Sequence, residues 1–241
     1  MRRILLVATR DVAGFFGSDW GPAVLAATLL AEAGWFFGWA LPSGAAYSAD
    51  VLERFFALHG VVSLGLAALL SVRSLADERV QGTWTLLRGA PLSDRELTLG
   101  KYAGVMVTLA GQALLTGHFP ALLMVHGDLG LGHLVVGYCG ALGLASVGAA
   151  VSLWASSITE RQVLALSVAS IVLVPLAGAS FISRVVDPPF RSIVAYASVL
   201  DRHQRAWSEG QANTETVVLF GTLTFVFLLM ATQSLCARRW A

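Results

Sequence analysis

The chain alternates between long apolar runs and short polar segments. Stretches without any charged residue cover 33–49, 55–72, 102–127, 129–159, 162–183 and 216–237. A helix that crosses a bilayer needs about 20 apolar residues, and each stretch supplies most or all of one such helix. The pattern therefore predicts an all-α integral membrane protein whose residues 1–241 form a single transmembrane domain. The six predicted spans are about 20–41, 54–72, 97–125, 133–155, 162–183 and 216–236.

A helix of a different kind is predicted before the first span. At 100° per residue, Arg3 and Arg10 lie opposite an apolar face. This face consists of Ile4, Leu5, Ala8, Val12, Phe15 and Phe16. An amphipathic helix of this type lies in the membrane interface rather than across the bilayer, so we expect an N-terminal interfacial helix.

The composition narrows the class of protein. Hydrophobic residues make up 56% of the chain and charged residues only 13%, whereas soluble domains carry roughly 25% charged residues. A soluble enzyme, a disordered chain and a nucleic-acid-binding protein are therefore excluded. Eleven of the sixteen Lys and Arg residues lie on one side of the six predicted spans, together with both ends of the chain. The positive-inside rule then predicts that both termini are cytoplasmic.

Residues 73–96 form a polar segment that is longer than a simple turn between two spans requires. Gly82 divides it, and the first half should present Asp77, Glu78 and Arg79 outwards. At its end, 93–96 reads Ser-Asp-Arg-Glu, the pattern of a capping box at the start of a helix. A short helix that lies along the membrane, charged on one side and apolar on the other, could sit in a groove of a cytosolic partner.

Residues 73–104 read RSLADERVQGTWTLLRGAPLSDRELTLGKYAG and resemble the signature of the exporter-type (type-2) ABC transporter permeases. The residues that carry the resemblance are Glu78, Gly82-Thr83, Leu86-Leu87, Pro91 and Gly100-Lys101. A second pattern of this family, ASSITERQ, covers 155–162. The order of elements is most similar to the gliding-motility-associated branch, although 203–210 depart from that branch.

The resemblance implies a non-catalytic permease subunit of an ATP-driven transporter, which we expect to be an exporter in the plasma (inner) membrane of a bacterium or archaeon. It implies a cytoplasmic coupling helix between spans two and three. The expected contacts with the ATPase are Asp77, Glu78, Arg79, Gly82, Thr83, Leu86 and Leu87, with a smaller second contact at Thr159 and Glu160. Its partners are the lipid bilayer, a second permease copy or paralogue, and a cytosolic ABC ATPase, with no nucleic acid.

No cofactor is expected on the chain itself. Its one Gly-Lys pair, 100–101, has Arg95 where a phosphate-binding loop needs its first glycine. ATP and Mg²⁺ should therefore bind to the partner subunit.

Two alternative functions remain open at this point. An intramembrane protease is one, because Ser43 and the Phe55–His59 stretch are similar to elements of such enzymes. A passive membrane scaffold or channel is the other.

Polar residues within the apolar runs are further candidates. Glu32 lies about 16 Å from the inner start of span one, near the middle of the bilayer. A carboxylate at that depth must be protonated, paired or exposed to water. It could therefore belong to a translocation cavity or bond to a neighbouring helix.

Four metal-capable residues gather at the outer end of spans three and four, with spacings that match no known metal site, so we expect no metal. They are His118, His126, Asp128 and His133.

Small residues also follow one another along the fourth predicted span. Gly137, Gly140 and Gly143 recur every three residues. Such a face lets helix backbones approach closely in lipid. We expect it to pack within the chain, with a dimer interface as the alternative.

Overall fold

The structure is a computed structural model that describes residues 1–41, 48–80, 82–83, 89, 91–126 and 130–237. Its described part contains helices and no strand. The longer elements are α2 (Trp20–Trp35) with its π-helical continuation η1 (Phe36–Ala40), α3 (Ser48–Val80), α5 (Asp94–Thr116), α7 (Leu131–Ile158), α8 (Gln162–Ala177) and α12 (Thr214–Ala237). The shorter ones are α1 (Arg2–Phe16), α6 (His118–His126), α9 (Ala179–Ser183), α10 (Phe190–Tyr196), η2 (Val199–Gln204) and α11 (Arg205–Ser208).

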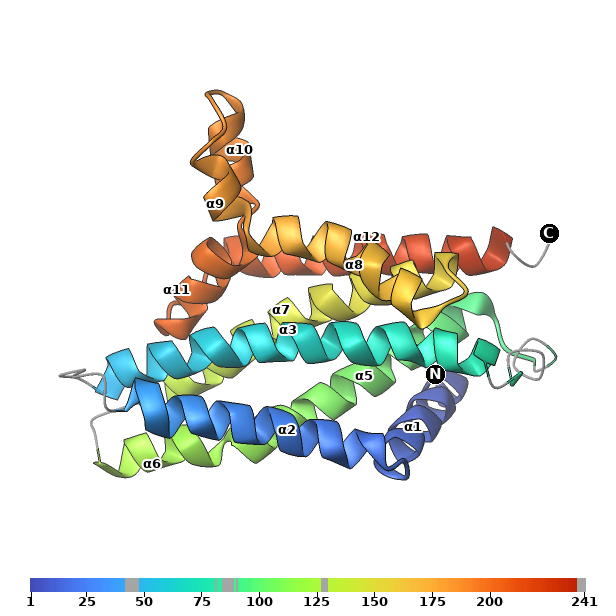
Figure 1. Ribbon diagram of the computed structural model, residues 1–241, viewed down its shortest axis with the longest axis horizontal. Helices are drawn as coiled ribbons and strands as arrows, with labels where there is room; N and C mark the ends of the chain where they lie inside the picture. Colours follow the sequence, from blue (N-terminus) through green and yellow to red (C-terminus); the bar gives the residue numbers. More distant parts are fainter. Residues whose placement is uncertain (42–47, 81, 84–88, 90, 127–129, 238–241) are drawn as a thin grey trace.

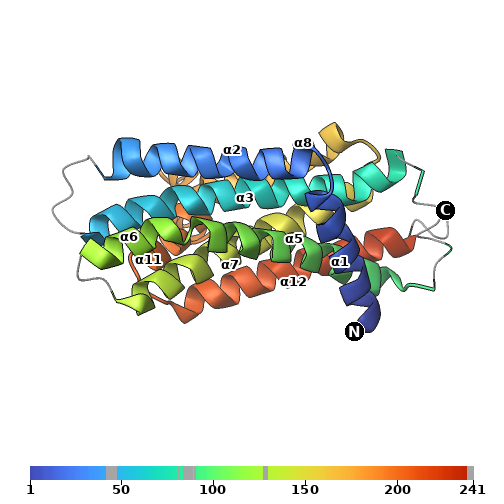
Figure 2. The ribbon, with the colours of Figure 1, turned by 90° about the horizontal axis from the view of Figure 1, so that it is seen from below.

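The long helices run side by side along the long axis of the molecule, and α1 crosses the bundle at one end (Figures 1 and 2). We call this the α1 end. The N-terminus lies there, together with the ends of α3, α7 and α12 and the starts of α2, α5 and α8 (Figure 1). The opposite end holds η1, α6 and α11. The longer elements therefore have the antiparallel arrangement that the pattern of charge-free runs predicts.

In the described part of the chain, five helices are long and apolar enough to cross a membrane, which suggests a membrane-embedded protein. They cover Trp20–Ala40, Ser48–Val80, Asp94–Val125, Leu131–Ile158 and Thr214–Ala237. The last predicted span, 216–236, begins and ends within two residues of α12. The all-helical class is confirmed, and so is the N-terminal helix, which appears as α1.

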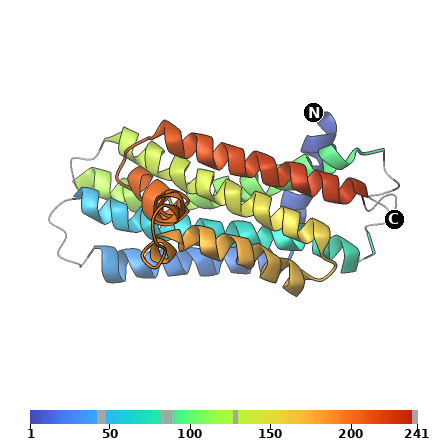
Figure 3. The same ribbon diagram turned by 90° about the horizontal axis from the view of Figure 1, so that it is seen from above.

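The predicted span at 162–183 is not one continuous helix. α8 has 16 residues and is about 24 Å long, which is short of the ~30 Å hydrocarbon core. Pro175 lies in its last turn and Gly178 follows its end. Proline removes a backbone donor, and glycine ends helices readily. Beyond this break, α9 and α10 leave the side of the bundle (Figures 1 and 3). The count of six spans is therefore not confirmed.

α3 also differs from the prediction. It continues without a break for 33 residues, from Ser48 to Val80. The first half of the expected coupling helix, 74–80, is therefore the last two turns of a long rigid helix and not a separate helix. Leu86 and Leu87 lie outside the described residues.

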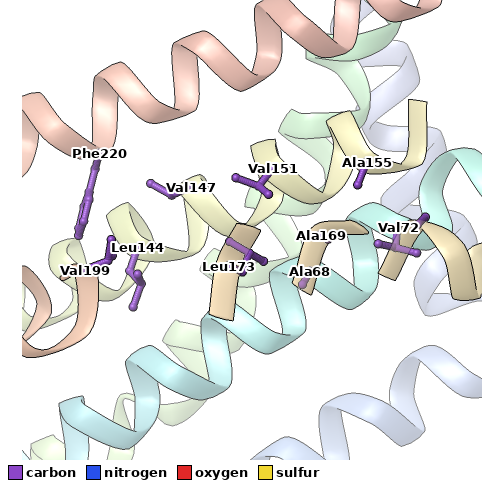
Figure 4. Packing of buried hydrophobic residues seen from close by; sticks show 11 residues of the cluster. Ala68, Val72, Leu144, Val147, Val151, Ala155, Ala169, Leu173, Val199 and Phe220 are labelled. Atoms are coloured by element: carbon purple, nitrogen blue, oxygen red, sulfur yellow. The ribbon is translucent and has the colours of Figure 1, made fainter. Parts of the chain in front are cut away.

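α7 is the centre of the bundle, and its small residues pack within the chain. A Cβ atom on Gly137 would lie 2.3 Å from the Phe56 ring, and one on Gly143 would lie 2.8 Å from Phe220. Buried side chains of α3, α8 and α12 surround the next turns of α7 (Figure 4). Large side chains of neighbouring helices fill the spaces above these glycines, which confirms the expectation of packing within one chain.

Candidate functional site

The site begins at the start of α5, where the predicted capping box is present. The Ser93 hydroxyl accepts from the Glu96 backbone N–H at 3.2 Å, and the Ser93 N–H donates to the Glu96 carboxylate at 3.0 Å. These two bonds satisfy donors that a helix start leaves without partners. α5 therefore starts at a defined residue, and this determines the direction in which the side chains of its second turn point.

Two glycines in the following turns of α5 let α1 cross closely. A Cβ atom on Gly100 would lie 2.6 Å from the Val7 Cβ, and one on Gly104 would lie 3.3 Å from the Asp11 Cβ. The buried face of α1 is thus the one that carries Val7, Ala8 and Phe15. Leu5 and Phe16 of the predicted apolar face are exposed on the surface of the protein, where an interfacial helix would meet lipid.

Lys101, next to Gly100, joins three helices. Its side chain is only 2% exposed, and its Nζ atom lies 3.1 Å from Glu78 Oε1 on α3 and 3.2 Å from Asp11 on α1. It also donates to the Ser74 carbonyl at 2.8 Å. A buried ammonium ion needs such partners, because its desolvation is costly. Burial raises the pKa of the Asp11 carboxyl, and the charge of Lys101 acts in the opposite direction.

Glu78 is the centre of this arrangement, which we call the charge cluster: Arg10, Asp11, Glu78, Thr83 and Lys101. Its carboxylate accepts from Arg10 at 3.0 Å, from Lys101 and from the Thr83 hydroxyl. The expectation that Glu78 faces outwards is wrong, since its side chain is 9% exposed. Two cations and a hydroxyl group draw the carboxylate into the protein.

The turn after α3 explains why a Gly-Thr pair follows Glu78. Gly82 has φ +72°, a conformation that glycine adopts without the steric cost of a Cβ atom. This turn directs the chain back towards the helix, and Thr83 contacts the carbonyl and the carboxylate of Glu78. Glycine and threonine at these positions therefore have a local structural role.

Arg79 connects α3 to the second predicted contact segment. Its guanidinium donates to the carbonyls of Ser156 at 3.1 Å and Ser157 at 3.3 Å, and to that of Thr159. These are the last carbonyls of α7, where the helix dipole favours a cation. In addition, the Ser156 hydroxyl donates to the Val72 carbonyl on α3 at 2.9 Å. The structure therefore brings 73–83 and 155–160 together at the α1 end.

The surface next to this junction carries the remaining predicted contact residues. Asp77 is paired with Arg73 at 3.0 Å, and its side chain is 32% exposed. Glu160 is exposed, and Thr159 and Thr83 are half-buried. Asp77 and Glu160 are thus the acidic side chains of the predicted set that a partner could reach.

Glu32 belongs to a separate cluster in the middle of the bundle. It is fully buried, and its carboxylate lies 3.1 Å from His59 Nδ1 on α3. It also accepts from Gln112 Nε2 on α5 at 2.9 Å. Glu32 therefore bonds to two neighbouring helices. The structure thus shows the bond to neighbouring helices that was one of the two alternatives for Glu32.

Of the four metal-capable residues, the two whose side chains the structure describes bond to backbone carbonyls. His118 Nδ1 lies 2.7 Å from the Leu115 carbonyl, and His133 Nε2 lies 2.9 Å from the Ser208 carbonyl. Asp128 lies outside the described residues, as does Ser43 of the protease alternative. No group of three metal-capable side chains occurs in the described part of the chain.

Sequence reasoning missed the role of Asp11 and the inward direction of Lys101. A signal was present, because Lys101 is the only lysine of the chain and follows a glycine next to an apolar run. A single buried cation implies buried carboxylates nearby. Their identity depends on how α1 crosses α5.

No model of a known protein family matches the chain, and no curated protein matches it. The class that the fold defines is a helical bundle whose apolar helices suggest a membrane-embedded protein, with an ion-paired cluster at one end.

Proposed function

We propose that the chain is the permease subunit of an ABC transporter of the exporter type, driven by ATP hydrolysis on a separate subunit. The observation that carries the proposal is the convergence of three separated stretches at the end of α3. Glu78 bonds to Thr83 and to Lys101, while Arg79 bonds to backbone carbonyls within the first five residues of the ASSITERQ stretch. Part of the two stretches behind the family resemblance therefore meets in space, with contacts between positions up to 80 apart.

This arrangement is suited to transmit movement. A force applied at 77–83 acts directly on α3, which continues as one helix towards the opposite end. Lys101 links α3 to α5, Arg10 links it to α1, and Arg79 links it to α7. A partner that moves the end of α3 would therefore move four helices together. The sequence predicts a separate coupling helix, whereas in this proposal the ATPase acts on the end of α3 itself.

In this proposal the α1 end faces the cytoplasm, and ATP and Mg²⁺ bind to the ATPase. α8 serves as a sixth and shorter crossing. Two permease subunits, identical or related, form the complete pathway in the plasma (inner) membrane of a bacterium or archaeon. The work done is export of a substrate or a mechanical movement, as in the gliding-motility-associated branch.

Co-expression with each ABC ATPase subunit encoded in the source genome, followed by co-purification, tests the proposal. The variants Asp77→Lys and Glu160→Lys place cations on the exposed surface of the α1 end. Like-charge contacts at an interface are costly, so the double variant should retain about tenfold less ATPase. The loss should depend on ionic strength, because exposed charges are screened by salt.

The control is Glu215→Lys, which reverses a carboxylate that is 42% exposed at the opposite end, where Glu215 pairs with Arg202. This variant should retain the ATPase like the unmodified protein. Undiminished co-purification of the Asp77→Lys/Glu160→Lys variant, with intact folding, would contradict the proposed contact.

A further inference from the structure

A pocket of about 400 Å³ lies beside the charge cluster. Its walls come from α1, the turn before α2, the start of α2, the last turns of α3 and the third to fifth turns of α5. The volume falls within the roughly 300–1,000 Å³ of sites that hold small molecules. Neither the family resemblance nor the proposed transport function assigns a ligand to this pocket.

The walls of the pocket are of two kinds. One part is charged and carries equal numbers of cations and carboxylates: Arg10, Arg73, Lys101, Asp11, Asp77 and Glu78. The other part is apolar and includes Phe15, Trp20, Leu70 and Val105. A ligand that matches both parts has a head with a positive and a negative group and an apolar body. The balance of signs argues against a purely anionic ligand.

The position of the pocket favours a lipid as the source of such a ligand. Trp20 begins the first apolar helix of membrane-spanning length, and α1 lies across the bundle at the same level. Tryptophan is enriched where lipid headgroups meet the hydrocarbon core. The pocket therefore lies at the depth of one layer of headgroups, with its aromatic wall at the boundary to the acyl chains.

The charged wall retains groups that can bind a ligand. Arg10 is 55% exposed and holds Glu78 through one nitrogen. Arg73 holds Asp77 through Nε, and its guanidinium lies 3.8 Å from the centre of the Trp20 ring. Each guanidinium has five N–H donors, so both arginines keep donors for a phosphate group. Asp77 bonds to Arg73 through one oxygen only in the described contacts, and its second oxygen can accept from an amine.

We propose that this pocket binds a phosphoethanolamine headgroup, with the phosphate on Arg10 and Arg73 and the primary ammonium on Asp77. A choline headgroup has no N–H to donate, and a glycerol headgroup has no positive charge. Phosphatidylethanolamine supplies this chemistry together with an apolar body, whereas soluble glycerophosphoethanolamine supplies the head alone.

Native mass spectrometry of the delipidated protein tests this assignment. The protein is incubated with an equimolar mixture of phosphatidylethanolamine, phosphatidylcholine and phosphatidylglycerol, and the retained lipids are counted. We expect one phosphatidylethanolamine per chain, retained about tenfold more than the other two lipids. Soluble glycerophosphoethanolamine in excess should not displace it. Displacement would instead show that the head alone is the ligand and would overturn the assignment to a lipid.

Gly14→Leu is the blocking variant. Gly14 lines the pocket, and a Cβ atom there meets nothing within 4 Å, so the leucine enters the pocket and removes no existing contact. Its matched control is Gly111→Leu, a helix position with equal space outside the lining residues. Gly14→Leu should lose the retained lipid, whereas Gly111→Leu should keep it.

A second pair of variants tests the chemistry without filling the pocket. Asp77→Asn should abolish the preference for ethanolamine over choline. The control Arg202→Gln removes the cation of the exposed Arg202–Glu215 ion pair at the opposite end and should leave the preference unchanged. Equal retention of the three lipids by the unmodified protein would overturn the proposal. So would full retention in Gly14→Leu, or an unchanged preference in Asp77→Asn.

Discussion

Two buried polar clusters lie at different depths of the same bundle. The Glu32 cluster is closed, since Glu32 is fully buried and His59 is 1% exposed. The charge cluster is open at one side, because Arg10 is 55% exposed and a pocket lies against Lys101. Both clusters join three helices. A closed cluster stabilises one arrangement, whereas an open one keeps charges that a partner or a lipid can reach.

Lys101→Met should have the largest effect on stability. It leaves Glu78 and Asp11 with one cation fewer in a place where water is largely excluded. Breaking a buried ion pair in this way costs about 3–5 kcal/mol, which should appear as a large drop in the thermal midpoint in detergent. Arg202→Gln removes an exposed pair and should cost less than about 1 kcal/mol.

A double variant separates this loss from a general effect of the methionine. Lys101→Met/Glu78→Gln removes both charges, so it should cost clearly less than the sum of the two single variants. Additive losses would show that Lys101 and Glu78 do not interact as the 3.1 Å distance indicates.

Gly100→Ala should have the next largest effect, because it acts on the crossing of α1 over α5. The new methyl group would lie 2.6 Å from the Val7 Cβ, and overpacking of this kind costs about 1–3 kcal/mol. Gly111→Ala on the same helix meets nothing within 4 Å and should raise stability by up to about 1 kcal/mol. Thermal unfolding of both variants provides the comparison. Equal midpoints would mean that α1 does not pack at Gly100.

Glu32→Gln tests the closed cluster. The amide keeps the shape and one acceptor oxygen, so it can still accept from Gln112 or from His59. We expect a loss of about 0.5–1.5 kcal/mol in unfolding free energy. Stimulation of the partner ATPase should stay unchanged, because Glu32 contacts other helices. A variant that folds normally but changes transport would instead assign Glu32 to the pathway.

Asp11→Asn should have the smallest effect at neutral pH and a distinct pH dependence. Burial raises the pKa of Asp11 above its ordinary value of 3.8. Its contribution to stability is therefore fully present below 3.8 and decreases as the pH rises through the higher folded value. The midpoint of the unmodified protein should fall relative to Asp11→Asn over that window. At neutral pH the two should differ by no more than about 1 kcal/mol. A difference that does not depend on pH would contradict the raised pKa.

Much of the fold could be predicted from local patterns. The capping box at Ser93 marks the start of α5 because its hydrogen bonds involve neighbours in the chain. The amphipathic pattern before the first span predicts α1, and the charge-free runs predict the five helices of membrane-spanning length in the described residues. The break after α8 shows the limit of hydropathy, because Pro175 and Gly178 change the backbone but not the apolar character of the run.

The candidate site was less predictable, since its contacts join distant positions. The family resemblance around Glu78 predicts a segment that contacts the ATPase. The inward direction of the Glu78 side chain, however, depends on Lys101, 23 positions later. The partners of Glu32 lie 27 and 80 positions away on other helices. A single sequence contains the residues of such contacts but not the rotation of the helices that brings them together.

Site-specific photocrosslinking tests the central claim, that the α1 end binds a cytosolic ATPase, most directly. A photoreactive residue is placed at position 160, at the α1 end, or at position 215, at the opposite end, and each protein is co-expressed with the ATPase. The account predicts a crosslinked permease–ATPase product from position 160 and none from position 215. No product from position 160, or a product from position 215, would contradict it.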